Sequence, residues 1–313
     1  MDKARGTGVA TRSAVVVNPA KVADLDGRRR DICTALASAG WPEPAWLETT
    51  PEDPGCGQAR AAVADGAQVV FACGGDGTVM ACATALAGTD VALAVLPSGT
   101  GNLLAANLGL PDDPVAGVRL ATGTGRQRLD VGVVDDRCFV VMAGMGFDAK
   151  MLEDASERLK ARLGWPAYVL SGLRHLRDRP MRLRIRLDDQ PPLRVRARAV
   201  VVGNVGRLQG GLRLLPEAEP DDGLLDVAVL APRDLRHWLT LGWSVLRGRH
   251  DRAPMRTYRA ATVEIDSDRE QPRELDGDVI EPGRRLTVRV RPRALVLCVP
   301  EPDEDKDLTT GGS

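Results

Sequence analysis

The chain has 313 residues, two to three times the length of a usual domain, so two domains are expected. Its composition, 43% hydrophobic and 27% charged, argues against wholesale disorder, a collagen-like repeat and a disulfide scaffold. Aromatic residues make up only 3%, which argues against a base-stacking surface, and we expect no nucleic-acid partner.

The net charge of −1 conceals an asymmetry between the two halves of the chain. Residues 1–150 carry 13 basic and 17 acidic side chains, whereas residues 151–300 carry 28 basic and 21 acidic ones. A cationic half suits an anionic partner, such as a membrane surface or a phosphate-bearing substrate. The alternative is an arginine-rich, solvated surface without a partner.

Cysteine spacing and apolar runs indicate the cellular compartment in which the protein is expected to work. The six cysteines include no C-x-x-C pair, so neither a zinc site nor a redox pair is indicated, and free thiols suit a reducing compartment. Residues 1–12 contain no apolar segment of a signal peptide. The long uncharged run Val91–Pro111 is broken by Pro97 and two glycines, so we expect a cytoplasmic protein without a membrane span.

The first third of the chain alternates short β-branched runs with helical segments. Such alternation predicts a parallel sheet covered by helices on both faces, which we assign to a nucleotide-binding α/β domain over residues 13–129. The expected strands are 14–17, 45–49, 68–73 and 91–96, and the expected helices are 25–39, 57–65, 78–87 and 103–108.

Strand patterns without intervening helices dominate the later part of the chain, which predicts an antiparallel β-sandwich domain over residues 130–293. Residues 294–300 are an optional last strand of the first domain, and 1–12 and 301–313 are expected to be flexible tails. A hairpin is expected at 129–143 and helices at 150–178 and 233–247. The period-two strands are 181–187, 193–202, 224–230, 262–267, 286–291 and 294–299.

A glycine-rich loop, Gly74-Gly75-Asp76-Gly77-Thr78, lies between an expected strand and helix. Glycines let backbone N–H groups approach a phosphate, and the start of the helix adds a partial positive charge. We expect Gly75 to require glycine for this approach and for its φ angle, and Thr78 to cap the helix or contact phosphate. A tight turn without a ligand is the alternative.

A second loop of the same kind, Pro97–Asn102, follows 24 residues later and supplies Gly99, Thr100 and Asn102. Loops after neighbouring parallel strands lie at one edge of the sheet, so the two loops are expected to form one phosphate cradle. Asn18 and Thr50 end the first two strands at the same edge. They are expected to line the nucleotide, with ordinary turn residues as the alternative.

These two loops resemble those of the diacylglycerol-kinase catalytic family, which includes bacterial lipid kinases and the sphingosine and ceramide kinases. Further segments fit in order: Ala143–Ala149, Gly203-Asn204, Asp221–Val227 and Leu275–Asp278. The resemblance covers about residues 13–300. It implies an ATP-binding α/β domain, a β-sandwich domain, and Mg²⁺-dependent transfer of the ATP γ-phosphate to a lipid hydroxyl.

The resemblance also implies a structural Mg²⁺ held by the Asp222 carboxylate and the carbonyls of Glu219 and Leu224, and such hard oxygen ligands suit that ion. Two positions depart from the family pattern. Leu103 follows Asn102 where the family often has aspartate, and Asp278 stands where the family has glutamate.

Phosphoryl transfer needs a group that accepts the proton of the attacking alcohol. None of the three histidines lies in a glycine motif, so carboxylates are the candidates. We assign Asp278 as the general base, with Asp76 assisting or holding Mg²⁺. Asp276 has two equally good interpretations, a functional residue or a turn residue before Gly277.

Six arginines alternate with apolar residues over 182–186 and 194–198 and would share one face of a hairpin. The face is expected either to adsorb to anionic phospholipid or to pair with Glu264 and Asp266. A stripe containing Trp238 and Trp243 in the helix at 233–247 suits either the core or a membrane interface.

The sequence therefore predicts a peripheral membrane lipid kinase that uses ATP and Mg²⁺ and acts on a lipid alcohol, with diacylglycerol as the expected substrate and phosphatidic acid as the product. The alternatives are an NAD-kinase-like or sugar kinase with a soluble substrate, and a catalytically silent nucleotide- or lipid-binding regulator. A homodimer is an open option.

Overall fold

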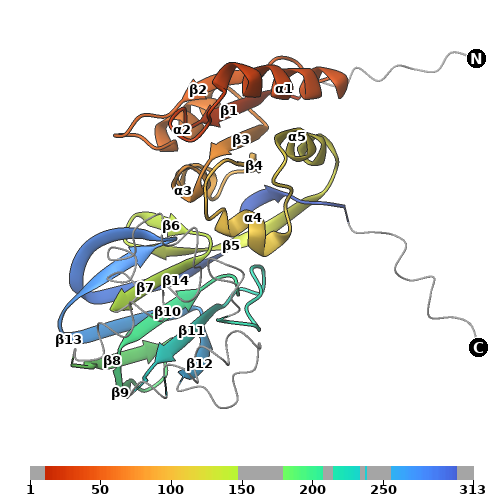
Figure 1. Ribbon diagram of the computed structural model, residues 1–313. Helices are drawn as coiled ribbons and strands as arrows, with labels where there is room; N and C mark the ends of the chain where they lie inside the picture. The colour runs from red at the N-terminus through yellow and green to blue at the C-terminus, as the bar shows by residue number, and fades with distance from the viewer. Residues whose placement is uncertain (1–10, 147–178, 207–213, 233–236, 238–254, 302–313) are drawn as a thin grey trace, which may run out of the picture.

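The structure, a computed structural model, describes residues 11–146, 179–206, 214–232, 237 and 255–301. The expected helix at 150–178 and, apart from His237, the helix at 233–247 with Trp238 and Trp243 lie outside these residues. An α/β domain stands on a β-sandwich domain (Figure 1). None of the described helices is long and apolar enough to cross a bilayer.

The first domain is built on a parallel sheet in the order β2–β1–β3–β4. Its central strands are wholly buried because they are short, uncharged and rich in β-branched residues. The strands are β1 (Ser13–Val17), β2 (Ala45–Glu48), β3 (Val69–Gly74) and β4 (Ala92–Pro97), and all four expected strands are confirmed.

Helices cover both faces of this sheet, because successive strand residues point to opposite sides. Val15 and Phe71 share one apolar cluster with α1 and α5, and Val16 and Val70 share the other with α2 and α3. The helices are α1 (Leu25–Ser38), α2 (Cys56–Ala64), α3 (Asp76–Leu86), α4 (Leu103–Leu108) and α5 (Pro114–Thr122).

The second domain is antiparallel and encloses its own apolar cluster. The predicted hairpin at 129–143 forms β5 and β6, and β7 follows as a separate strand. The strands are β5 (Arg126–Val134), β6 (Arg137–Phe139), β7 (Met142–Gly146), β8 (Met181–Leu187), β9 (Leu193–Ala197), β10 (Ala199–Gly203), β11 (Leu225–Leu230), β12 (Met255–Ala260), β13 (Thr262–Leu275) and β14 (Asp278–Cys298).

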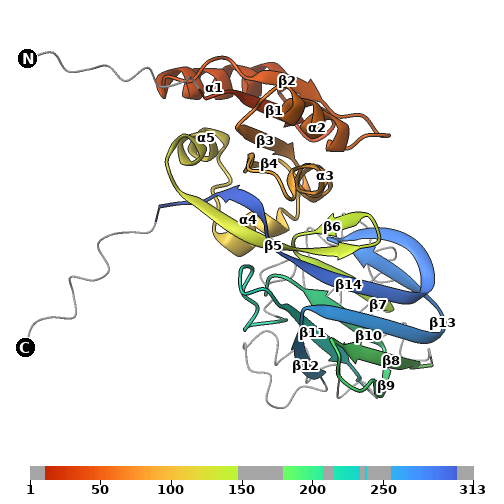
Figure 2. The ribbon, with the colours of Figure 1, turned by 180° about the vertical axis from the view of Figure 1, so that it is seen from behind.

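The last strand, β14, joins the two domains (Figure 2). It pairs antiparallel with β13 at its start and with β5 further along. Near its end, Val296 and Leu297 pair in parallel with β4 of the first domain. One strand therefore carries Asp278 in the sandwich and ends in the α/β sheet.

The expected single strand at 193–202 is wrong. The chain breaks at Arg198 into β9, which pairs with β8, and β10, which pairs with β7 and β11. Arg198 is half-buried and its Nε donates to the Pro232 carbonyl at 3.1 Å. Arg198 therefore does not belong to the exposed arginines of this hairpin, which number five rather than six: Arg182, Arg184, Arg186, Arg194 and Arg196.

Candidate active site

The first glycine loop leads directly from β3 into α3. Gly75 is the N-cap residue of α3, and as a glycine it has no side chain to accept a hydrogen bond from the first amides of this helix. Free N–H groups and the helix dipole make such an N-terminus suitable for an anion. Gly75 has φ −90° and ψ −170°, an extended conformation open to any residue, so the expected demand on its φ is wrong.

The second glycine loop packs against the first. The Ser98 N–H donates to the Gly74 carbonyl at 2.8 Å. A Cβ on Gly99 would lie 2.6 Å from the Cα of Gly75, a contact that no real Cβ makes. Only glycine at position 99 therefore lets the two loops approach this closely, and they lie side by side as the sequence predicts.

Asp76 and Asn102 fasten the two loops together. Asp76 Oδ1 accepts the Leu103 N–H at 2.6 Å, which links the start of α3 to the start of α4. The Asn102 amide accepts from the Gly99 N–H at 3.1 Å and donates to the Gly99 carbonyl at 3.0 Å. The Asn102 side chain thus closes its own loop, whereas the Asp76 carboxylate joins the two loops.

Three other predicted nucleotide contacts use their side chains locally. Thr78 is 2% exposed and packs against Gly74; it does not cap α3, whose N-cap is Gly75. Thr50 Oγ1 accepts the Asp53 N–H at 3.1 Å, and Asn18 Oδ1 accepts the Ala20 N–H at 3.0 Å. These bonds are turn contacts.

A tight turn carries the predicted base. Leu275 and Asp278 pair across the β13–β14 hairpin, and the two residues between them have positive φ, +48° at Asp276 and +90° at Gly277. This is the geometry of a type I′ turn, in which aspartate and glycine are favoured. The turn therefore places Asp278 at the first position of β14.

Asp276 anchors this turn. The residue is 5% exposed, and its carboxylate accepts the N–H groups of Val140, Val141 and Met142 at 2.7–2.9 Å. Burial raises the pKa of Asp276 to about 7, although the three N–H donors oppose the shift. These contacts support the interpretation of Asp276 as a turn residue, which also holds residues 140–142 in place, whereas a functional role stays a prediction.

Asp278 faces the first glycine loop across the domain boundary. A Cβ on Gly77 would lie 3.6 Å from Asp278 Oδ2. Asp278 is exposed to solvent, but partial desolvation by its neighbours raises its pKa, and the positive charge of Arg137 at the start of β6 opposes this shift. Desolvation also raises the pKa of Asp76, with the charge of Asp278 adding to the effect. The two predicted catalytic carboxylates are therefore electrostatic neighbours.

Arg137 provides a test of this electrostatic arrangement. A base must be ionised to accept a proton, so kcat/KM should fall at acid pH with an inflection above the ordinary aspartate range. In Arg137→Gln the opposing charge is gone, the pKa of Asp278 rises, and the acid limb should move up by up to about 1 pH unit. If the acid limb of the pH profile stays in place or moves to lower pH in Arg137→Gln, the proposed electrostatic interaction between Arg137 and Asp278 is contradicted.

The predicted metal segment surrounds Asp222. Its Oδ1 accepts the Leu224 N–H at 2.8 Å, and its other oxygen contacts the Arg259 guanidinium. No group of three or more potential ligand side chains suited to a metal ion occurs within the described parts of the chain. The assignment of Glu219, Asp222 and Leu224 as ligands therefore stays a prediction.

Acidic residues gather around this segment, and Arg259 already pairs with two of them. Desolvation, followed by the charges of Glu217 and Glu219, raises the pKa of Asp226 to about 6. Arg259 Nε lies 3.6 Å from Asp226 Oδ2 and supplies positive charge to the cluster. A hard divalent cation would compensate the same carboxylates.

Sequence reasoning missed two charged residues near the loops. Arg137 follows a hairpin turn that contains no motif. Its effect on Asp278 becomes visible only in the structure, because the two residues are far apart in the sequence. Arg28 of α1 has one buried guanidinium nitrogen without a hydrogen-bond partner among the described residues, and its charge opposes the burial that raises the pKa of Cys73 at the end of β3. The only signal in the sequence was the Arg28–Arg30 run after the first strand.

Two family models together match most of the chain. Residues 12–134 match the diacylglycerol kinase catalytic domain, and residues 140–299 match the YegS C-terminal NAD kinase beta sandwich-like domain. The chain belongs to this diacylglycerol-kinase family. The resemblance drawn from its motifs is therefore confirmed, as is the combination of an α/β domain with a β-sandwich domain.

Curated relatives carry lipid-kinase names. A Pseudomonas aeruginosa protein named "Probable lipid kinase YegS-like" is 35% identical over 244 residues, covering 76% of this chain and 79% of the relative. A Mycobacterium tuberculosis protein named "Diacylglycerol kinase" is 32% identical over 214 residues, covering 66% of this chain and 69% of the relative.

Solved structures share the fold. The crystal structure of a diacylglycerol kinase from Bacillus anthracis superposes with a TM-score of 0.71 at 21% identity, covering 92% of this chain and 96% of the other. An NAD kinase from Archaeoglobus fulgidus in complex with ATP reaches a TM-score of 0.54 at 14% identity, covering 92% and 94%. At these identities the likeness concerns the fold alone.

Proposed function

We propose that this protein is an ATP-dependent lipid kinase that phosphorylates diacylglycerol to phosphatidic acid. The observation that carries the proposal is the juxtaposition of the two glycine loops with Asp278 of the second domain. A phosphate held at the α3 N-terminus would then lie beside a carboxylate that is able to accept a proton.

In the proposed reaction the hydroxyl oxygen of the lipid forms a bond to the γ-phosphorus of ATP. The bond from that phosphorus to the bridging oxygen breaks, ADP leaves, and the hydroxyl proton passes to Asp278. The N–H groups of the two loops hold the phosphates in line, and Asp76 keeps the loops in register through its bond to the Leu103 N–H. Mg²⁺ bound with ATP would neutralise phosphate charge.

Diacylglycerol is the substrate we propose, because one relative is named "Probable lipid kinase YegS-like" and another is named "Diacylglycerol kinase". The substrate resides in a bilayer, so we also propose that the protein works at a membrane surface.

A panel of lipid alcohols in detergent micelles tests the substrate. With ATP labelled in its γ-phosphate, we expect label in phosphatidic acid when diacylglycerol is present, and much less in the products of monoacylglycerol, sphingosine or ceramide. Preferential labelling of another lipid would replace diacylglycerol as the substrate. Labelling of none of them would reject the lipid-kinase proposal.

A further inference from the structure

The exposed side of the β8–β9 hairpin belongs to the sandwich domain and takes no part in the proposed phosphoryl transfer. Met181, Leu183, Ile185 and Leu187 of β8 are buried, so the alternating arginines all point outward. We use the name arginine face for Arg182 and Arg184 of β8 together with Arg194 and Arg196 of β9. Figure 1 shows both strands at the end of the sandwich away from the α/β domain.

The register of the hairpin places these like charges directly opposite one another. Arg182 pairs with Arg196, and Arg184 pairs with Arg194. Cβ atoms of directly opposed residues in such a pair lie about 4.5–5.5 Å apart, and like charges there destabilise the hairpin. An anion between two opposed guanidinium groups would remove this repulsion and accept hydrogen bonds from both.

Two carboxylates, Asp266 and Asp268, lie beside the arginine face, and the Asp268 carboxylate accepts the backbone N–H of Arg182 at 3.2 Å. Asp266 lies opposite Arg184 on β13, but its carboxylate accepts from Arg285 Nε at 2.7 Å. Glu264 pairs with Arg186 at 3.5 Å, so the expected pairing with acidic residues is met at Arg186 and not at Arg184. Among the described residues, no carboxylate forms an ion pair with the four arginines of this face.

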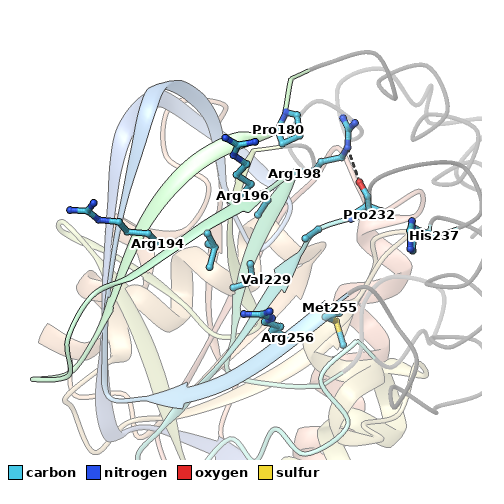
Figure 3. A pocket seen from close by; sticks show the side chains of 12 residues that line it. Pro180, Arg194, Arg196, Arg198, Val229, Pro232, His237, Met255 and Arg256 are labelled. Atoms are coloured by element: carbon cyan, nitrogen blue, oxygen red, sulfur yellow. Dashed lines mark hydrogen bonds between the residues drawn. The ribbon is translucent and has the colours of Figure 1, made fainter.

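Two hollows flank β9 and share Arg194 and Arg196. One is a cavity of 740 Å³ whose lining also includes Arg256, Val229 and Met255 and, among the described residues, no carboxylate. Figure 3 shows Arg198 turned toward Pro232, whereas Arg194 and Arg196 extend away from it. The other hollow, of 470 Å³, is lined by Arg182 and Arg184 but also by Asp266 and Asp268. Anionic groups are therefore better accommodated in the larger cavity.

We infer that the arginine face is a docking surface for a bilayer of anionic phospholipid, with headgroup phosphates held between opposed arginines. This inference rests on the proposed function, because a kinase for a bilayer lipid must meet a bilayer, and the described helices include no membrane span. Side chains aligned on one sheet face suit a planar array of identical charges. The surface is separate from the glycine loops, so it adds a membrane contact without altering the ATP site.

Vesicle co-sedimentation tests the inference with a matched pair of double variants. Arg184→Ser with Arg194→Ser removes one opposed pair, and Arg30→Ser with Arg60→Ser removes the same charge from exposed positions on α1 and α2. On vesicles containing phosphatidylglycerol we expect the first to bind about 20- to 30-fold more weakly than wild type, and the second less than about threefold. Binding should weaken with salt and be absent on phosphatidylcholine alone.

Thermal unfolding shows whether the first variant is folded. Because it loses a like-charge pair, its midpoint should equal or exceed that of the wild type. Equal vesicle binding by wild type and the first variant, or equal losses in both variants, would overturn the docking surface. Wild-type binding to duplex DNA as tight as to anionic vesicles at the same salt would overturn the choice of a bilayer.

The kinase proposal is measured separately on the same proteins. In detergent micelles all three should phosphorylate diacylglycerol at similar rates, because neither variant touches the loops or Asp278. Absence of phosphorylation in the wild type would reject the proposed function, whereas vesicle binding needs no turnover and would be judged by itself.

Discussion

Asp278→Asn should reduce turnover about 10²- to 10⁴-fold with little change in ATP affinity. The amide keeps the shape of the side chain at the start of β14 but is unable to accept the proton of the attacking hydroxyl. We expect the ATP affinity to be preserved, because the two glycine loops that we propose hold the phosphates are left intact by the substitution. Steady-state kinetics on diacylglycerol micelles, with calorimetry for ATP, separate the two effects.

Asp278→Glu is the matched control, because it keeps the carboxylate and restores the residue that the family carries at this position. It should retain activity within about tenfold of the wild type. Turnover by Asp278→Asn close to the wild-type rate would show that Asp278 is not the base. Asp76, its electrostatic neighbour, would then be the residue to test.

Gly99→Ala should weaken ATP binding about 10- to 100-fold, equivalent to the loss of one or two hydrogen bonds to a charged group. Its Cβ would lie 2.6 Å from the Cα of Gly75, and a backbone atom has no rotamer by which to move away. The two loops must therefore separate, and the amides that converge on the phosphates diverge. Calorimetric titration with ATP measures the loss.

Gly75→Ala provides the comparison within the same pair of loops. Its Cβ would meet the Cα of Gly99 at 3.4 Å, and its φ of −90° suits alanine. It should leave the melting temperature near that of the wild type and reduce ATP affinity only by crowding the phosphate, whereas Gly99→Ala should lower both. Unchanged ATP affinity in Gly99→Ala would contradict the assignment of the two glycine loops as the phosphate-binding site.

The first domain was the most predictable part of the chain. Short uncharged runs such as Val69–Gly74 have few alternatives to a buried parallel strand, and glycine clusters mark the turns that follow them. The helix α5 was missed, although Asp113 caps it and Pro114 opens it in the usual N-terminal arrangement. That segment follows another helix, which the alternating pattern did not anticipate.

Long-range contacts explain most of what the sequence did not show. The carboxylate of Asp276 binds amides of residues 140–142, more than 130 positions away, and no local pattern encodes that pairing. The break at Arg198 was hidden for a different reason. Residues on either side of it keep strand propensity, while the chain changes its pairing partner there.

The central claim is tested most directly by offering the wild-type protein ATP labelled in its γ-phosphate with either diacylglycerol in micelles or NAD⁺ in solution. The account predicts label in phosphatidic acid, none in a phosphorylated dinucleotide, and loss of the lipid product in Asp278→Asn. Label in the dinucleotide instead would make the protein a kinase for a soluble substrate. Label in neither, with ATP still bound, would identify a catalytically silent nucleotide-binding protein and contradict the account.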